Sequence, residues 1–313
     1  MNDTALVSII VAGLTFGAPL VYVAMGELVS QRAGVMNLSL DGTMLVSAVS
    51  GYSVAAETGS LWLALAVSIG VGSLMSATFA MLTITLRASQ VLSGLGLLVF
   101  GTGMSQYLGR IGDDPLIGRL AHVSIKPYTT GGLTDVPLLG PILFGHDFII
   151  YGSWLLVALT YFYLNHTEPG LSIRAVGNDP SSAEAAGVRV ARVRAVHVII
   201  GGGLAGLGGA YYSLGLTTIW QERITGGAGW LVIAIVIGSR WQPVPAFLAA
   251  FIFGASIRLG FTLQVVGTNI PTELLNMIPY ILAIVAILLT ALSPSRGLTE
   301  PKALGIPFFR EQR

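Results

Sequence analysis

Nine long runs of apolar residues, separated by short polar segments, dominate the sequence. They lie at about 4–25, 37–56, 61–86, 91–109, 147–165, 192–217, 227–239, 243–264 and 273–292. An α-helix needs about 20 apolar residues to cross the hydrocarbon core of a bilayer. The sequence therefore predicts an all-α fold: a polytopic transmembrane helical bundle of about nine spans, with one domain over residues 1–313.

The seventh run, 227–239, is short for a complete crossing, and it follows a glycine-rich stretch from Ile224 to Gly229. Irregular backbone is tolerated at membrane depth only where protein or a cavity covers it. We therefore expect a short or re-entrant helix here.

The composition agrees with a membrane protein. Charged residues make up only 10% of the chain, whereas a soluble domain has about 25%. There is no cysteine, which excludes disulfides and thiolate metal sites. The four histidines are scattered and form no metal-binding motif, so no metal site is predicted.

The placement of lysine and arginine predicts the orientation, because basic residues are enriched in cytoplasmic loops. The polar segment 167–194 carries four arginines. If this segment is cytoplasmic, most of the 16 Lys and Arg residues lie inside. The N-terminus is then outside and the C-terminus inside. Residues 110–146 form an extracytoplasmic loop, and residues 293–313 form a cytoplasmic tail.

The middle of the cytoplasmic segment has the signals of a short helix. Asp179 is a good N-cap, Pro180 suits the first helical position, and Gly187 suits a helix end. We predict about two turns of helix, capped at both ends. Its small side chains would let another protein approach closely: Ala183, Ala185 and Ala186. An ordinary solvated loop helix is the alternative, and the arginines that follow also suit lipid head groups.

A few polar residues at or within the predicted spans are candidates for a solute pathway. They are Asn37, Ser39, Asp41 and Arg258. Ionisable residues in spans usually face the bundle interior or water, so these residues either line a pathway or make structural contacts. Asn37 could also cap the second span. In a predicted outer turn, Glu222 and Arg223 either contact an extracytoplasmic protein or are simply solvated.

One glycine pattern admits two interpretations. Gly201, Gly203 and Gly206 match the G-x-G-x-x-G of dinucleotide-binding loops, but they lie inside one long apolar run with no room for a strand. Gly202 and Gly206 also form G-x-x-x-G, which lets membrane helices pack closely. We therefore predict helix packing.

Three motifs resemble those of ABC-transporter permeases of the ribose/nucleoside/branched-chain amino acid class. Residues 26–45 (GELVSQRAGVMNLSLDGTML) are similar to a signature of this class, closest to its nucleoside (purine lipoprotein-linked) branch, with Gln31 and Asp41 where Glu is usual. Residues 174–187 resemble the cytoplasmic coupling segment of the class. Residues 226–243 (GGAGWLVIAIVIGSRWQP) resemble a third motif.

The resemblance implies a function. Such a permease forms half of a pore, and its short cytoplasmic helix docks in a groove of a separate ATPase subunit that binds ATP and Mg. An extracytoplasmic solute-binding protein or lipoprotein delivers the solute. The resemblance gives these ATPase-coupling residues: Arg174, Gly177, Asn178, Asp179, Pro180, Ala183, Glu184, Ala186 and Gly187.

We therefore expect a permease subunit rather than an enzyme, without a cofactor of its own, because G-x-x-x-x-G-K-[ST] is absent from the sequence. The expected surroundings are a bacterial cytoplasmic (inner) membrane, its lipids and a paralogous second permease, without nucleic acid. The expected solute is a nucleoside or a related small neutral compound. A simple sugar, a branched-chain amino acid or a urea-like solute is the alternative. A stand-alone secondary transporter or channel is a further alternative, with Asp41 as its one candidate ion site.

Overall fold

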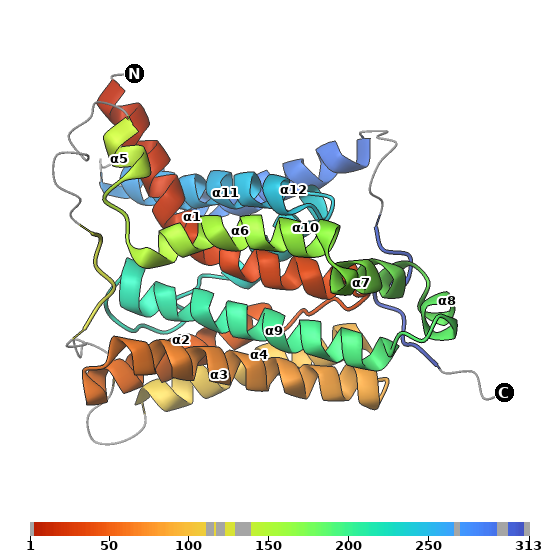
Figure 1. The fold of residues 1–313 in the computed structure, drawn as a ribbon. Helices are drawn as coiled ribbons and strands as arrows, with labels where there is room; N and C mark the ends of the chain where they lie inside the picture. Colours follow the sequence, from red (N-terminus) through yellow and green to blue (C-terminus); the bar gives the residue numbers. More distant parts are fainter. Residues whose placement is uncertain are drawn as a thin grey trace.

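Long α-helices lying side by side make up most of the computed structural model (Figure 1). The structure describes residues 3–110, 116, 123–128, 139–265, 270–292 and 300–309. The elements are α1 (Asp3–Arg32), α2 (Leu40–Thr58), α3 (Leu61–Ala80), η1 (Met81–Thr85), α4 (Gln90–Arg110), α5 (Leu139–Leu143), α6 (Phe148–His166), α7 (Glu168–Asn178), α8 (Pro180–Ala185), α9 (Val190–Tyr211), η3 (Tyr212–Leu216), α10 (Ala228–Gly238), α11 (Pro243–Val265) and α12 (Thr272–Leu292). The turns η1 and η3 are π-helical, and no strand occurs among these described residues. The predicted all-α fold is confirmed for this part of the chain.

Within the described part of the chain, seven helices are long and apolar enough to cross a membrane. They are α1, α3 with η1, α4, α6, α9 with η3, α11 and α12. Each of the nine predicted runs contains a helix, but α2 and α10 are not among the seven. The chain is thus a multi-pass membrane protein, and nine complete crossings stay a prediction.

Protein surrounds helix α2 on most sides. It contacts α3, α4, α9 and α10, and most of its side chains are buried. Among them are the polar side chains of Asp41, Thr43 and Ser47. A helix that faces protein rather than lipid can carry such groups. The Asp41 carboxylate accepts a hydrogen bond from Gly229, whereas the Thr43 and Ser47 hydroxyls have no hydrogen-bond partner among the described residues.

The bundle has two ends, which we name after the short helices found there. The start of α1 and α5 lie at the α5 end, whereas α7, α8 and residues 300–309 lie at the α8 end (Figure 1). The described chain therefore starts and finishes at opposite ends of the bundle. A chain that crosses the membrane an odd number of times must likewise have its two ends on opposite sides.

Glycines bring α1, α3 and α9 into backbone contact. A Cβ on Gly26 would lie 2.8 Å from the Cα of Gly201, and one on Gly72 would collide with the carbonyl oxygen of Gly202 and lie 2.8 Å from the Cα of Gly206. The glycine-rich pattern in α9 therefore serves close helix packing, as predicted, and the dinucleotide interpretation is wrong.

A pair of variants on α3 tests this packing. We expect Gly72→Val to destabilise the bundle by about 1–3 kcal/mol, because the added atoms must displace the backbone of α9. Gly70→Val is the matched control, since a Cβ on Gly70 meets nothing within 4 Å. Thermal unfolding of both purified variants in detergent measures the difference. Equal melting temperatures would contradict the packing.

Helices α2 and α10 both begin well inside the bundle. A Cβ on Gly42 would lie 2.8 Å from the Cα of Leu98, near the middle of α4. A Cβ on Gly229, in the first turn of α10, would lie 2.6 Å from the Cα of Asp41. Helix α10 has only 11 residues, which is too few to cross a bilayer. The predicted short helix is therefore confirmed, and its first turn abuts the start of α2.

Candidate functional site

Helix α8 is held at both of its ends. The Asp179 carboxylate accepts hydrogen bonds from the Ser181 Oγ (2.6 Å), the Ser182 Oγ (2.5 Å) and the Ser182 backbone N–H (3.0 Å). These donors hold the pKa of the Asp179 carboxyl well below its usual range. Pro180 occupies the first turn, and Gly187 ends the segment with φ of +91°. The predicted capped helix is confirmed, with six residues.

The stabilisation of α8 by the Asp179 cap depends on pH and can be tested by mutation. Because the folded pKa of Asp179 is depressed, its stabilising effect is present above the unfolded pKa and is lost as pH falls through the folded pKa. We expect Asp179→Ala to fray α8 at neutral pH, since the first turn loses its acceptor. Faster hydrogen exchange of the α8 amides would report this. Asp179→Asn keeps an acceptor and should exchange almost as slowly as wild type; equal rates in all three proteins would contradict the cap.

The alanines of this segment face in different directions. Ala183 is 4% exposed and packs with Val176 and Val190 in a small apolar cluster of the chain itself. Ala185 and Ala186 are exposed. The small size of Ala183 therefore serves internal packing, and the surface that another protein could contact is formed by the other two alanines.

A second helix, α7, precedes α8 and was not predicted from the sequence. Thr167 caps it through a hydrogen bond from the Gly170 N–H (3.1 Å), a signal that was available in the sequence. Gly177 packs directly on the carbonyl oxygen of Arg32, so the glycine permits close approach to the end of α1. Among the predicted coupling residues of α7, Arg174 is half-buried and Asn178 is exposed.

Residues 300–309 lie across the α8 end, and we call them the C-terminal strap. The Ala303 N–H donates to the Gly177 carbonyl oxygen (2.9 Å), and the Gly305 N–H donates to the Gly34 carbonyl oxygen (3.3 Å). The strap therefore joins α7 to the turn that follows α1. The sequence predicted only a cytoplasmic tail over residues 293–313 here.

Arg194, near the start of α9, fixes the strap from the inside. Its Nε donates to the Ala33 carbonyl oxygen (3.1 Å) and its Nη1 donates to the Ile306 carbonyl oxygen (3.0 Å). The residue is only 3% exposed. A buried guanidinium that bonds two backbone segments holds them in a fixed relation.

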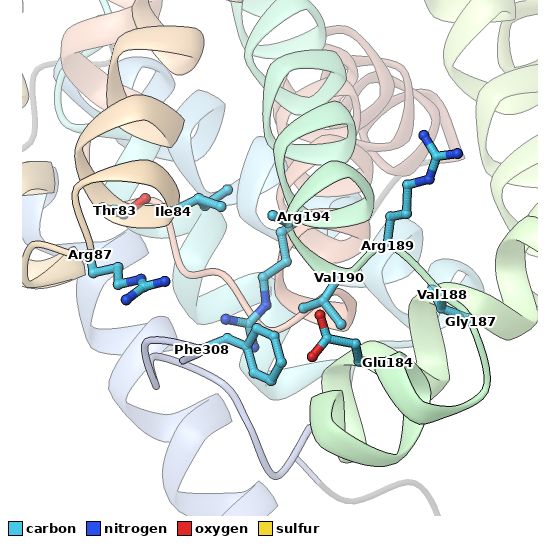
Figure 2. Close-up of a pocket in the computed structure, with 11 residues that line it drawn as sticks. Thr83, Ile84, Arg87, Glu184, Gly187, Val188, Arg189, Val190, Arg194 and Phe308 are labelled. Carbon is cyan, nitrogen blue, oxygen red and sulfur yellow. The ribbon is translucent and has the colours of Figure 1, made fainter. Parts of the chain in front are cut away.

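A cavity of about 440 Å³ lies between α8, the start of α9, the end of η1 and the strap (Figure 2). Figure 2 shows Glu184 of α8 and Arg194 of α9 on either side of Phe308, with Arg87 across the cavity. The Arg87 guanidinium also lies 4.8 Å from the ring centre of Phe309. Contacts of the strap thus link α8 to the ends of α1, α9 and η1.

The first and third sequence motifs meet in the bundle. The buried Glu27 Oε1 accepts hydrogen bonds from the Gln31 Nε2 (2.8 Å) and the Asn37 N–H (3.0 Å). The Gln31 Oε1 accepts one from the Trp241 Nε1 (2.6 Å), and Arg32 donates twice to the Trp241 carbonyl oxygen (2.9 and 3.0 Å). These motif residues fix the turn after α10 against the end of α1.

The candidate pathway residues around the start of α2 make specific structural contacts. Asn37 Oδ1 accepts hydrogen bonds from the N–H (3.0 Å) and the Oγ (2.6 Å) of Ser39, and its Nδ2 donates to Ser76 (3.3 Å). The Asp41 Oδ1 accepts a hydrogen bond from the Gly229 N–H (3.1 Å). Asp41 therefore joins the start of α2 to the first turn of α10.

The other candidates lie apart from this cluster. Arg258 is exposed on α11, with its guanidinium 5.9 Å from the ring centre of Phe16. Glu222 forms an ion pair with Arg110 at the end of α4, in which the Arg110 Nε lies 2.6 Å from the Glu222 Oε1. This pair connects the loop before α10 to α4. Arg223 is exposed in the same loop, with φ of +54°.

Comparisons with known proteins agree with these features. A family described as "Branched-chain amino acid transport system / permease component" matches residues 9–287. The chain is 38% identical to the putative glucose ABC transporter permease protein TsgC13 of Haloferax volcanii, over 75% of this chain and 71% of that protein. It is 31% identical to the guanosine permease protein NupQ of Bacillus subtilis and 29% identical to the nucleoside permease protein NupC of Lactococcus lactis, over 100% of each chain. No solved structure matches the chain.

The same three organisms each have a second, more distant match named for the same solute. These proteins are TsgB13, NupP and NupB, at 24%, 27% and 25% identity.

Proposed function

The chain belongs to the branched-chain amino acid transport system permease component family, and from this premise we propose that it carries a nucleoside into the cytoplasm as one membrane subunit of an ABC importer. The observation that supports the solute most is the alignment over 100% of both chains with permeases named for guanosine and nucleosides. A simple sugar is the second candidate, because the putative glucose permease has the higher identity.

The proposed arrangement in the membrane follows from the basic residues. The α8 end lies in the cytoplasm and the N-terminus lies outside. Helix α2, and the short α10 together with the glycine-rich loop before it, bring the number of spans to about nine in the cytoplasmic (inner) membrane of a bacterium. Arginines 87, 174, 189, 192 and 194 all lie at or near the α8 end, as the preference for basic cytoplasmic loops requires.

The proposed partners follow from the geometry and from the relatives. A separate ATPase subunit, which binds ATP and Mg, would receive the exposed side of α8 around Ala185 and Ala186. An extracytoplasmic solute-binding protein or lipoprotein would meet the α5 end, where Glu222 and Arg223 are candidate contacts. A paralogous second permease would complete the pore, in keeping with the two related permeases in each of the three organisms.

Uptake by the reconstituted complex tests this function. The tagged permease, isolated with its partner subunits from its host, is placed in proteoliposomes with ATP inside and solute-binding protein outside. We expect radiolabelled guanosine to accumulate, and glucose and leucine to stay near background. Accumulation of glucose alone would replace the nucleoside with the sugar, and uptake driven by a gradient without ATP would overturn the ABC permease.

A further inference from the structure

A polar cleft of about 350 Å³ opens between the 217–227 loop, α10, α11 and α12. Its apolar walls carry aromatic rings from four elements, namely Phe16, Tyr212, Phe261 and Tyr280. Its polar groups are few and mostly uncharged, with Gln221 and Asn276 exposed at the mouth and Thr225 buried. Arg223 is the one charged residue among the described lining.

The inner part of the cleft contains a buried polar group. Thr225 is only 5% exposed, and its side chain interacts with the Asp41 carboxylate. A hydroxyl that donates to a carboxylate still has lone pairs that can accept. The Thr225 oxygen can therefore accept a hydrogen bond from whatever occupies the cleft.

The cleft also lies at the start of α10, the short helix that begins inside the bundle. Tyr212 and Tyr280 line it, and Asp41 holds the first turn of α10. The Tyr280 hydroxyl donates to the Gly226 carbonyl oxygen (2.6 Å), so this ring is held against the loop. Broken helices of this kind form solute sites in other membrane transporters.

We propose that this cleft binds the base of a nucleoside during its passage, an inference that rests on the proposed function. A nucleobase is a flat ring whose faces suit aromatic walls and whose edges need a few donors and acceptors. Side-chain amides such as those of Gln221 and Asn276 supply both. The ribose hydroxyls would then find the Thr225 hydroxyl and the loop carbonyls.

The same lining disfavours the other solutes. Glucose exposes hydroxyl groups around its whole rim, and each would need a partner that the four aromatic walls do not provide. A branched-chain amino acid carries an ammonium group that needs an anion or several acceptors when buried. The described lining contains no carboxylate, and the nearby Asp41 is already bound to Gly229.

Photolabelling of the complete transporter tests the site directly. The probe is 8-azidoguanosine, irradiated with the complex in proteoliposomes and followed by mass spectrometry of peptides. We expect labelling within residues 212–227 or 276–280, removed by excess guanosine but not by excess glucose. Labelling elsewhere only, or protection by glucose instead, would overturn the cleft as a nucleobase site.

Variants supply a second, functional measurement. We expect Tyr280→Leu and Asn276→Leu each to lower guanosine uptake at least about tenfold, the ratio for a loss of about 1.4 kcal/mol. Tyr280→Phe, which keeps the ring face, should stay within about threefold of wild type. Asn165→Leu is the matched control, since Asn165 is exposed near the α8 end and, among the described residues, its side chain donates to Tyr161 of its own helix.

The outcomes separate the two proposals. If the wild type and the Tyr280 and Asn276 variants all take up guanosine normally, the cleft is not the site and the proposed function stands. If wild type takes up no guanosine, the proposed function fails, and the nucleobase assignment fails with it. If a variant does not purify as a folded complex, the photolabelling of wild type decides whether the cleft is the site.

Discussion

Replacing Ala186 by tryptophan is expected to abolish ATP-driven uptake without preventing insertion into the membrane. Ala186 is exposed at the C-terminal end of α8, next to the turn at Gly187. A partner that receives α8 in a groove must lie against this side, because Ala183 on the opposite side is buried in the chain itself. An indole ring there would hold the two surfaces apart, and a displacement of about 1 Å is enough to cost 100-fold in a positioned reaction.

The measurement compares uptake with complex assembly. We expect guanosine uptake by Ala186→Trp to fall at least about 100-fold, and the ATPase subunit to be lost from the purified complex. Ala186→Ser changes little volume and is the matched control. Normal uptake and normal co-purification of the tryptophan variant would show that α8 does not dock there.

The neighbouring variant Ala183→Trp should behave differently. Its side chain would have to enter the cluster formed by Val176 and Val190. Overpacking of such a site costs about 1–3 kcal/mol, so the α7–α8 segment should unfold locally, which faster hydrogen exchange would reveal. The sequence pattern treats the two alanines alike, whereas the fold separates them.

Hydropathy predicted the helices well because lipid imposes a simple requirement on them. Each of the nine apolar runs contains a helix, and the short helix at 228–238 follows from the length of its run. The burial of α2 was less predictable. Its burial comes from contacts with α3, α4 and α9, and such contacts depend on which helices are neighbours in space.

Contacts between distant segments explain most of what the sequence did not predict. Asp41 was a pathway candidate because of its charge, and its hydrogen bond to Gly229 joins residues 188 positions apart. Arg258 was a candidate for the pathway or for a structural contact, and it is exposed, because its place on the circumference of α11 depends on tertiary packing. Its role in the pathway stays a prediction. The strap has no hydrophobic period of its own and is defined by its hydrogen bonds to Gly34 and Gly177.

Replacing Arg194 by methionine is expected to uncouple ATP hydrolysis from transport. The guanidinium bonds Ala33 at the end of α1 and Ile306 in the strap. Its loss leaves the buried Ala33 carbonyl oxygen without this donor, at about 1–3 kcal/mol, and removes the bond to the part-buried Ile306 carbonyl oxygen. The strap connects α7 to the turn after α1, so a loosened strap would let the α7–α8 segment move without moving the spans.

The expected result is a fall in guanosine uptake of at least about tenfold, with ATPase activity of the complex within about twofold of wild type. Arg192→Met is the matched control, because Arg192 is exposed two residues earlier on the same helix. Deleting residues 300–313 removes the strap itself and should give the same separation of the two activities. Equal losses of uptake and ATPase activity would instead mean that the strap only stabilises the fold, and normal uptake in both variants would mean that force reaches the spans through α7 and Gly177 alone.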